Sequence, residues 1–269
     1  MGDAKKTGEE RIASAFAAAK EAGRAALMPY FTLGYPDLEQ SLAILEAIAP
    51  HSDLLELGVP FSDPLADGPT IQRSTQLSLE GGTTTADCLQ LLRSLRAKGV
   101  ETPAMLMGYY NPILAYGMEA YVRDAAEAGA QGFIVPDLPL EEAEELEQLA
   151  AEAGLALIHF LAPTSDEGRV KRVAARARGF IYMVSVTGVT GARETVEVDL
   201  SAFVERVRAE ATVPLAVGFG ISTAEQAGRV GEVADGVIVG SALINVVDGA
   251  EDKAAAAAEF VAGLRAGLT

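Results

Sequence analysis

One glutamate of this sequence lies inside an otherwise apolar strand. Glu56 stands between Leu55 and Leu57 in the segment Asp53–Val59. Removing a carboxylate from water is costly, and burial raises its pKa toward neutrality. A carboxyl group tuned in this way suits general acid–base catalysis near neutral pH. A structural glutamate bonded to a backbone donor or a lysine is the competing interpretation, and residue spacing alone does not separate the two.

A second carboxylate, Asp67, lies in the loop that follows this strand. The loop Pro60–Thr70 is rich in Pro, Gly and Asp and is long for a connection between a strand and a helix. Long loops at the end of a parallel sheet commonly carry function, so Asp67 is a candidate catalytic or hydrogen-bonding group. An aspartate before Gly68 and Pro69 is also an ordinary turn or N-cap residue, and residue type by itself favours that interpretation.

Two glycine-rich turns near the end of the chain suggest an anion site. Val217–Ser222 follows the seventh apolar run, and Val239–Leu243 follows the eighth. Glycine lets the backbone approach a ligand, and a helix opening at Ser241 would direct N–H groups at an anion. Phosphate-binding barrels bind their ligand at these two positions. We therefore favour a phosphate site over the alternative that both segments are turns with no ligand. The segment Ser185–Glu194, with its glycine hinges, is either a lid over the substrate or a surface loop.

The elements that must position these residues alternate between short apolar runs and longer amphipathic segments. The eight predicted strands are Ala26–Leu33, Leu54–Val59, Ala104–Tyr109, Gly132–Val135, Leu155–Leu161, Phe180–Val184, Pro214–Gly218 and Gly236–Val239. Eight such repeats in about 250 residues predict an α/β fold, a (β/α)8 TIM barrel. A doubly wound sheet is the alternative, but Leu33–Asp37 lacks a dinucleotide fingerprint.

Three helices are clear in the sequence. Leu89–Lys98 and Glu141–Ala153 carry leucines at helical spacing, and an extra N-terminal helix over Arg11–Ala22 is expected to cap the bottom of the barrel. No linker or change in composition divides the chain. We therefore expect residues 1–269 to form a single barrel domain.

Charge and composition exclude several classes of protein. Lys and Arg total 21 against 38 Asp and Glu, and the net charge of -17 disfavours nucleic acid as a partner. The single cysteine, Cys88, is expected in the core and leaves no intrachain disulfide, which fits a reducing cytoplasm. Met1–Glu10 lacks the apolar segment of a secretory signal, and no apolar run is long enough to span a membrane.

The remaining candidates are two histidines and a tyrosine. His51 and His159 have no cysteine or carboxylate cluster near them in the sequence, so we expect structural roles and no metal site. Tyr109, at the end of the third predicted strand, is either a core residue or a wall of the substrate site, and its place at the barrel mouth favours the wall.

The segment Leu55–Gln72 resembles the signature of the tryptophan synthase alpha chain family. Further segments agree with the family in order, so that the resemblance spans nearly the whole chain. They are Pro29–Pro36, Gly108–Pro112, Val135–Pro139, Ser185–Ala192 and Gly218–Ser222.

The resemblance implies a (β/α)8 barrel and a carbon–carbon lyase. The family's reaction is a retro-aldol cleavage of indole-3-glycerol phosphate to indole and glyceraldehyde 3-phosphate in tryptophan biosynthesis. Glu56 resembles the family's acid/base, which moves protons between the glycerol hydroxyl and indole C3. Asp67 resembles the carboxylate that stabilises charge at the indole N–H. One raised-pKa and one ionised carboxylate suit this chemistry.

The resemblance also implies a set of substrate-binding residues. Tyr30 stands where some members have Phe. The indole pocket maps to Tyr30, Thr32, Tyr109, Ile134 and Tyr182, and the phosphate contacts map to Gly191, Phe219, Gly220, Gly240 and Ser241. The family's loop containing Thr190 closes on the loop containing Asp67 and excludes water.

The family further implies a partner. A pyridoxal-phosphate-dependent beta chain docks around the barrel mouth, with Asp63 and Pro64 in the contact loop, and receives indole directly. We expect an alpha-beta-beta-alpha heterotetramer in the cytoplasm, with no cofactor in this chain. The alternatives are a free-standing indole-producing lyase, a catalytically silent activator of a beta-type partner, and a sugar-phosphate isomerase or epimerase.

Overall fold

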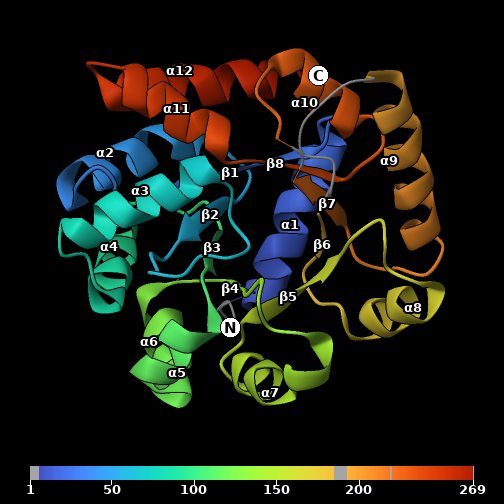
Figure 1. The fold of residues 1–269 in the computed structure, drawn as a ribbon, viewed down its shortest axis with the longest axis horizontal. Coiled ribbons are helices and arrows are strands. Elements are labelled where there is room, and N and C mark those ends of the chain that lie inside the picture. The colour runs from blue at the N-terminus through green and yellow to red at the C-terminus, as the bar shows by residue number, and fades with distance from the viewer. Residues whose placement is uncertain (1–5, 185–192, 219, 269) are drawn as a thin grey trace, which may run out of the picture.

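Eight parallel strands close into a barrel in chain order (Figure 1). The computed structural model describes residues 6–184, 193–218 and 220–268. The strands are β1 Ala26–Thr32, β2 Leu55–Gly58, β3 Ala104–Met107, β4 Gly132–Ile134, β5 Ala156–Leu161, β6 Ile181–Val184, β7 Leu215–Gly218 and β8 Gly236–Val239. Because β8 pairs with β1, the sheet has no edge, and the predicted barrel is confirmed over the doubly wound alternative. All eight predicted strands are present, with ends trimmed by at most two residues.

Helices surround the barrel and cover one of its ends (Figure 1). In the described ranges the α-helices are α1 Gly8–Glu21, α2 Leu38–Ile48, α3 Pro69–Glu80, α4 Thr85–Ala97, α5 Tyr110–Tyr116, α6 Met118–Ala128, α7 Glu144–Glu152, α8 Glu167–Arg176, α9 Arg193–Arg208, α10 Ala224–Gly231, α11 Ser241–Gly249 and α12 Lys253–Ala266. Two short 3-10 helices also occur in the described ranges: η1 Ala49–His51 lies between α2 and β2, and η2 Leu140–Glu142 lies between β4 and α7.

The predicted helix over Glu141–Ala153 was wrong at its start. The structure forms η2 first and begins α7 only at Glu144. Arg176 on α8 donates to the carbonyl of Leu140 at 2.8 Å. In a continuous α-helix that carbonyl would accept from the N–H of Glu144. The hydrogen bond from Arg176 on α8 therefore takes the carbonyl that the first turn of a longer α7 would use.

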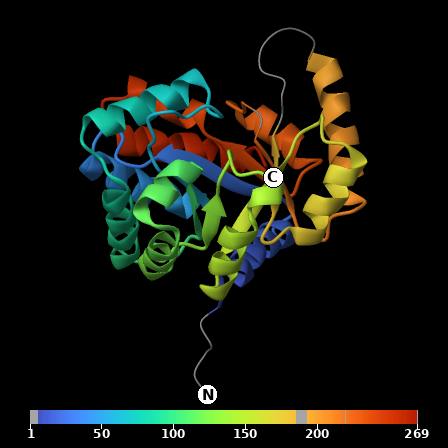
Figure 2. The same cartoon turned by 60° about the horizontal axis from the view of Figure 1, so that its bottom comes forward.

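The N-terminal helix covers the bottom of the barrel, as predicted. Gly8 donates its N–H to the carbonyl of Gly154, just before β5, at 2.7 Å. Further along α1, Phe16 packs against Phe180, which precedes β6, with ring centroids 5.8 Å apart. The helix thus contacts several strand starts. In Figure 2 it lies below the barrel, on the side where the chain begins.

Two apolar layers hold the barrel together. The inner layer fills the barrel and includes Met28, Met105 and Ile134. The outer layer lies between strands and helices and includes Leu55 and Leu57. Because successive side chains of a strand point to opposite faces, this arrangement directs the residue between two outward leucines into the barrel.

A buried ion pair stabilises the amino-terminal end of the strands. Arg24 donates to both oxygens of Asp53 at 2.6 and 2.8 Å, and Asp53 also accepts from the backbone N–H of Leu27 at 2.8 Å. This end of a TIM barrel serves stability, while the carboxyl ends of the strands carry chemistry. No helix in the described ranges is long and apolar enough to cross a membrane.

Candidate active site

Glu56 points into the barrel from β2. Its neighbours Leu55 and Leu57 belong to the outer layer, so alternation places the carboxyl group inside. The side chain is 1% exposed, and neither carboxylate oxygen has a hydrogen-bond partner among the described residues. The structural alternative, a glutamate satisfied by a backbone donor or a lysine, is therefore not observed in that part of the chain. A buried polar group without a partner is costly and is typical of a functional site.

Burial, assisted by the negative charge of Asp67, raises the pKa of Glu56 to about 8. The group is therefore protonated at neutral pH. A protonated carboxyl group with a pKa near the working pH can donate a proton and take one back during a reaction. This is the electrostatic state that the sequence analysis expected.

Asp67 faces the same site from the loop between β2 and α3. The hydroxyl of Tyr109 donates to Asp67 Oδ2 at 2.9 Å and accepts from the backbone N–H of Ala66 at 3.0 Å. The N-cap of α3 is Gly68, and Asp67 makes no capping bond, so the N-cap interpretation was wrong. Partial burial raises the pKa of Asp67, and the hydrogen bond from Tyr109 opposes that shift.

A small cavity lies beside Asp67 and Tyr109 at the barrel mouth. Its volume is about 10 Å³, which is room for roughly one water molecule. Its lining combines predicted and unpredicted residues: Tyr30, Val59, Phe61, Pro64, Asp67, Thr75, Met107, Gly108 and Tyr109. Val59 and Met107 carry no chemical signal in the sequence. Only their place at the carboxyl ends of β2 and β3 could have indicated that they line the site.

The other residues of the predicted indole pocket lie on the barrel strands. Thr32 on β1 is fully buried, and Ile134 ends β4 within the inner layer. Tyr182 on β6 packs against Phe160 on β5, with ring centroids 4.8 Å apart. Phe160 was missed by the sequence analysis because nothing in its type separates it from a core residue. The strand register places Phe160 and Tyr182 opposite each other.

The predicted phosphate residues are only partly within the described residues. Gly240 is the N-cap of α11 and Ser241 is its first residue, as expected from the sequence. Gly220 has a positive φ of 58°, a conformation that favours glycine. A side chain at Gly240 would begin 3.3 Å from the Tyr30 ring, so the start of α11 is in contact with Tyr30. Thr190, Gly191, Phe219 and the predicted lid over residues 185–192 lie outside the described residues.

His159 and Cys88 are both buried side chains outside the barrel interior. His159 lies on the outside of β5 and contacts Glu147, which also accepts from Arg176 at 2.5 Å. Burial lowers the pKa of His159. Cys88 on α4 is fully buried in the outer layer. Within residues 6–184, 193–218 and 220–268, no group of three metal-ligating side chains converges.

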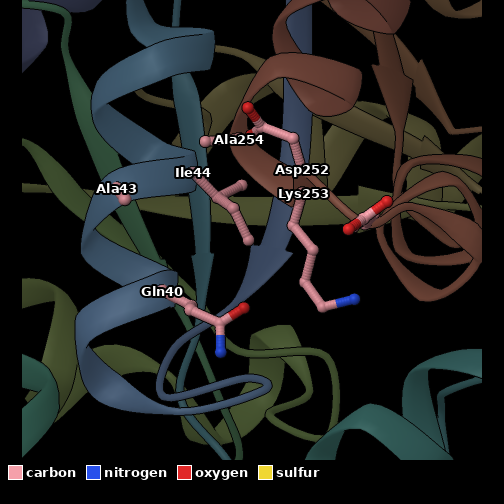
Figure 3. Close-up of a pocket in the computed structure, with 7 residues that line it drawn as sticks. Gln40, Ala43, Ile44, Asp252, Lys253 and Ala254 are labelled. Atoms are coloured by element: carbon pink, nitrogen blue, oxygen red, sulfur yellow. The ribbon is translucent and has the colours of Figure 1, made fainter.

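A larger hollow of about 660 Å³ lies away from the barrel mouth, between α2 and the start of α12. Figure 3 shows Gln40 and Ile44 projecting from α2 toward the side of Lys253, and Ala43 also lines the hollow. The ammonium group of Lys253 donates to two backbone carbonyls at the end of α11, at 2.9 and 3.0 Å. Its charge therefore stabilises a helix end, and no catalytic pair faces this hollow.

Comparisons with known proteins all lead to one family. A family model described as tryptophan synthase alpha chain matches residues 16–266. The tryptophan synthase alpha chain of Chloroflexus aurantiacus is 50% identical over 254 residues, which cover 93% of this chain and 96% of the relative. That of Roseiflexus castenholzii is 52% identical over 258 residues, 95% of this chain and 99% of the relative.

Two solved structures share the fold. The tryptophan synthase alpha subunit of Legionella pneumophila aligns with a TM-score of 0.89 and 37% identity, over 96% of this chain and 98% of that subunit. Tryptophan synthase from Mycobacterium tuberculosis aligns with a TM-score of 0.88 and 37% identity, over 96% of this chain and 98% of that chain.

Proposed function

The chain belongs to the tryptophan synthase alpha chain family, a family of lyases that cleave indole-3-glycerol phosphate, and we propose that Glu56 and Asp67 perform this cleavage here. The observation that carries the proposal is the buried carboxyl group of Glu56, which has no hydrogen-bond partner among the described residues and a pKa raised to about 8. A group of this kind, at the carboxyl ends of barrel strands, is poised to exchange protons with a substrate.

Glu56 moves two protons in this proposal. Its carboxylic acid protonates C3 of the indole ring, which converts the ring into an indolenine-like cation. The resulting carboxylate then takes the proton of the glycerol hydroxyl next to C3. As that hydroxyl becomes a carbonyl, the carbon–carbon bond breaks and its electron pair returns to the ring. The products are indole and glyceraldehyde 3-phosphate, and Glu56 is protonated again.

Asp67 stabilises the charge that this sequence creates. Protonation at C3 leaves positive charge on the indole nitrogen, and an ionised carboxylate near that nitrogen lowers the energy of the intermediate. The hydrogen bond from Tyr109 favours the ionised form of Asp67. In this proposal one carboxyl group is protonated and its neighbour reacts in the charged form, which is the division of roles that the reaction needs.

Substrate binding in this proposal uses the remaining residues of the predicted site. Tyr30, Thr32, Tyr109, Ile134 and Tyr182 form the indole pocket. The backbone at Gly220, Gly240 and Ser241, together with Gly191 and Phe219, binds the phosphate, and the loop containing Thr190 closes on the loop containing Asp67. The amino-terminal end of α11 attracts an anion through its unpaired N–H groups and its dipole, despite the negative net charge of the chain.

In this proposal the loop that carries Asp67 moves when substrate enters. The cavity of about 10 Å³ is far too small for an indole ring with a glycerol phosphate chain. Leu65 in this loop is 92% exposed, so the loop can leave the mouth without uncovering its own core. Closure over bound substrate would return Asp67 to the ring and exclude water.

We also propose a beta-chain partner, which docks at the exposed loop containing Asp63 and Pro64 and receives indole from this site. The complex would be an alpha-beta-beta-alpha heterotetramer in the cytoplasm. Pyridoxal phosphate would belong to the beta chain, and this chain would act through its own side chains. Residues 1–269 would act as one domain, since α1 and α12 both contact β1.

The first experiment measures indole formation from indole-3-glycerol phosphate by the purified chain, with and without a beta chain. Slow release alone and much faster release with the partner is the expected result. Fast release by the chain alone would indicate a free-standing lyase. No release under either condition would contradict the proposed reaction and favour a silent activator or a sugar-phosphate isomerase.

The second experiment removes the proton donor. Glu56→Gln keeps the shape of the side chain and should lower indole release by about 10²- to 10⁴-fold, the usual contribution of a general acid–base group. The matched control is Glu259→Gln, which makes the same change at an exposed position of α12. Unchanged turnover in Glu56→Gln, with the chain folded and bound to its partner, would refute the assigned role.

A further inference from the structure

The loop between β2 and α3, which carries Asp67, has few connections to the rest of the protein. Among the described residues, hydrogen bonds lead out of residues 60–67 only to the side chains of Tyr109 and Gln72. Other bonds of this loop are internal, such as the one from the N–H of Asp67 to the carbonyl of Pro64 at 3.1 Å. Two side chains therefore hold the polar groups of this loop in that part of the chain.

Gln72 reaches the loop from near the start of α3. Its side-chain amide nitrogen donates to the backbone carbonyl of Asp67 at 2.9 Å and lies 3.5 Å from the carbonyl oxygen of Pro64. Because both partners are carbonyl oxygens, the NH₂ end of the amide must face them. Gln72 thus holds the main chain of Asp67, whereas Tyr109 holds its carboxylate.

Helix α3 is a firm support for this contact. Ser74 Oγ lies 2.7 Å from Thr32 Oγ1 on β1, and Ser78 donates to the carbonyl of Leu33, just after β1, at 2.7 Å. Both serines are fully buried, and the helix also packs against α11. Gln72 therefore connects the loop to an element that is itself anchored to the barrel.

We propose that Gln72 is a positioning residue, which holds Asp67 in its reactive place through the backbone carbonyl of Asp67. This inference rests on the proposed role of Asp67 in stabilising charge. A carboxylate stabilises a cation less as the distance between them grows. Without the Gln72 amide the loop keeps the bond from Tyr109 but loses the bond to the main chain. A smaller fraction of the molecules then has Asp67 in the reactive place.

The contact also suits a loop that opens for substrate and closes again. The Gln72 side chain is exposed, so water replaces the carbonyl of Asp67 as its partner when the loop moves away. Opening therefore leaves no buried donor without a partner, and the cost of breaking the bond stays small. A hydrogen bond of this kind shifts the balance between the two loop positions by about 3- to 10-fold.

Helix α3 supplies a matched control one turn further on. Gln76 is also exposed, and its amide nitrogen donates to Glu80 at 2.9 Å, with no bond to the loop among the described residues. Gln72→Met and Gln76→Met each replace an amide by an apolar side chain of similar length. Because Met and Gln have similar helix propensities, a general effect on α3 should appear in both variants.

The experiment compares kcat and KM of indole release for the purified wild-type chain, Gln72→Met, Gln76→Met, Asp67→Asn and the double variant Gln72→Met/Asp67→Asn. In Gln72→Met, kcat should fall by about 3- to 10-fold at a nearly unchanged KM, because Asp67 acts on charge that forms during the reaction. Gln76→Met should match the wild type. In the Asp67→Asn background, Gln72→Met should cause no further loss, because the carboxylate that Gln72 positions is already gone.

Amide hydrogen exchange measures the position of the loop without the reaction. The N–H of Ala66 donates to the Tyr109 hydroxyl, and the N–H of Asp67 donates to the carbonyl of Pro64. Both bonds protect their hydrogens only while the loop keeps its place. Exchange at these two positions should become about 3- to 10-fold faster in Gln72→Met.

Four results would overturn the inference. They are an unchanged kcat in Gln72→Met, an equal loss in Gln76→Met, an equal further loss in the Asp67→Asn background, and equal exchange rates in the wild type and Gln72→Met. If Asp67→Asn keeps wild-type turnover, the proposed role of Asp67 fails instead. The exchange rates then still test whether Gln72 holds the loop.

Discussion

Glu56→Gln should make the protein more stable as well as inactive. In an unfolded chain the carboxyl group titrates near its ordinary pKa of 4.5, whereas in the folded chain its pKa is about 8. Below pH 4.5 the carboxyl group is protonated in both the folded and the unfolded chain, so its ionisation does not lower the free energy of unfolding. As the pH rises from 4.5 to about 8, the unfolded state loses the proton while the folded state keeps it, so the free energy of unfolding falls.

The size of this effect follows from the pKa difference. Each unit is worth about 1.4 kcal/mol, so near pH 7 the glutamate lowers the free energy of unfolding by about 3 kcal/mol. Glutamine has nearly the same shape and does not ionise. The variant should therefore gain about that amount near neutral pH and match the wild type near pH 4. Loss of activity with a gain in stability is typical of a residue kept for function.

Urea unfolding at a series of pH values measures this difference. The chain has no tryptophan, so far-ultraviolet circular dichroism is the suitable signal. The midpoint should rise in Glu56→Gln at an unchanged denaturant slope. The exposed control Glu259→Gln should change stability by less than about 0.5 kcal/mol at every pH. If Glu56→Gln shows the same pH dependence as the wild type, Glu56 is not desolvated and our account of its pKa is wrong.

Three further predictions concern the same site. Asp67→Asn should lower indole release by at least about 10²-fold and change stability by no more than about 1 kcal/mol, because Asp67 accepts from Tyr109 and does not cap α3; unfolding of the variant would contradict this. Wild-type turnover should fall above about pH 8 as Glu56 loses its proton, and fall again in acid as Asp67 gains one; a rate that keeps rising above pH 9 would exclude Glu56 as the acid. Gly58→Ala should destabilise the chain by about 1–3 kcal/mol in thermal or urea unfolding, because its Cβ would lie 2.1 Å from the Tyr30 oxygen; wild-type stability would show that the ring moves at no cost.

Local patterns in the sequence were sufficient for the fold. Strands buried on both faces are recognisable as short apolar runs, and their regular alternation with amphipathic segments limits the topology to a barrel or an open sheet. The exception was the helix predicted over Glu141–Ala153. Its first turn is altered by Arg176, which lies 36 positions from Leu140 in the chain and reaches it only in the folded protein.

The sequence by itself determined the barrel, the family resemblance and the two carboxyl candidates, because residue type, spacing and order along the chain carry that information. It left open whether Glu56 is satisfied by a partner and whether Asp67 caps a helix. Tertiary structure decided both questions, because hydrogen bonding and desolvation depend on groups from other strands. Tyr109 contacts Asp67 across 42 positions of the chain, and Ser74 reaches Thr32 across the same separation. Such contacts exist only after the strands close into a barrel.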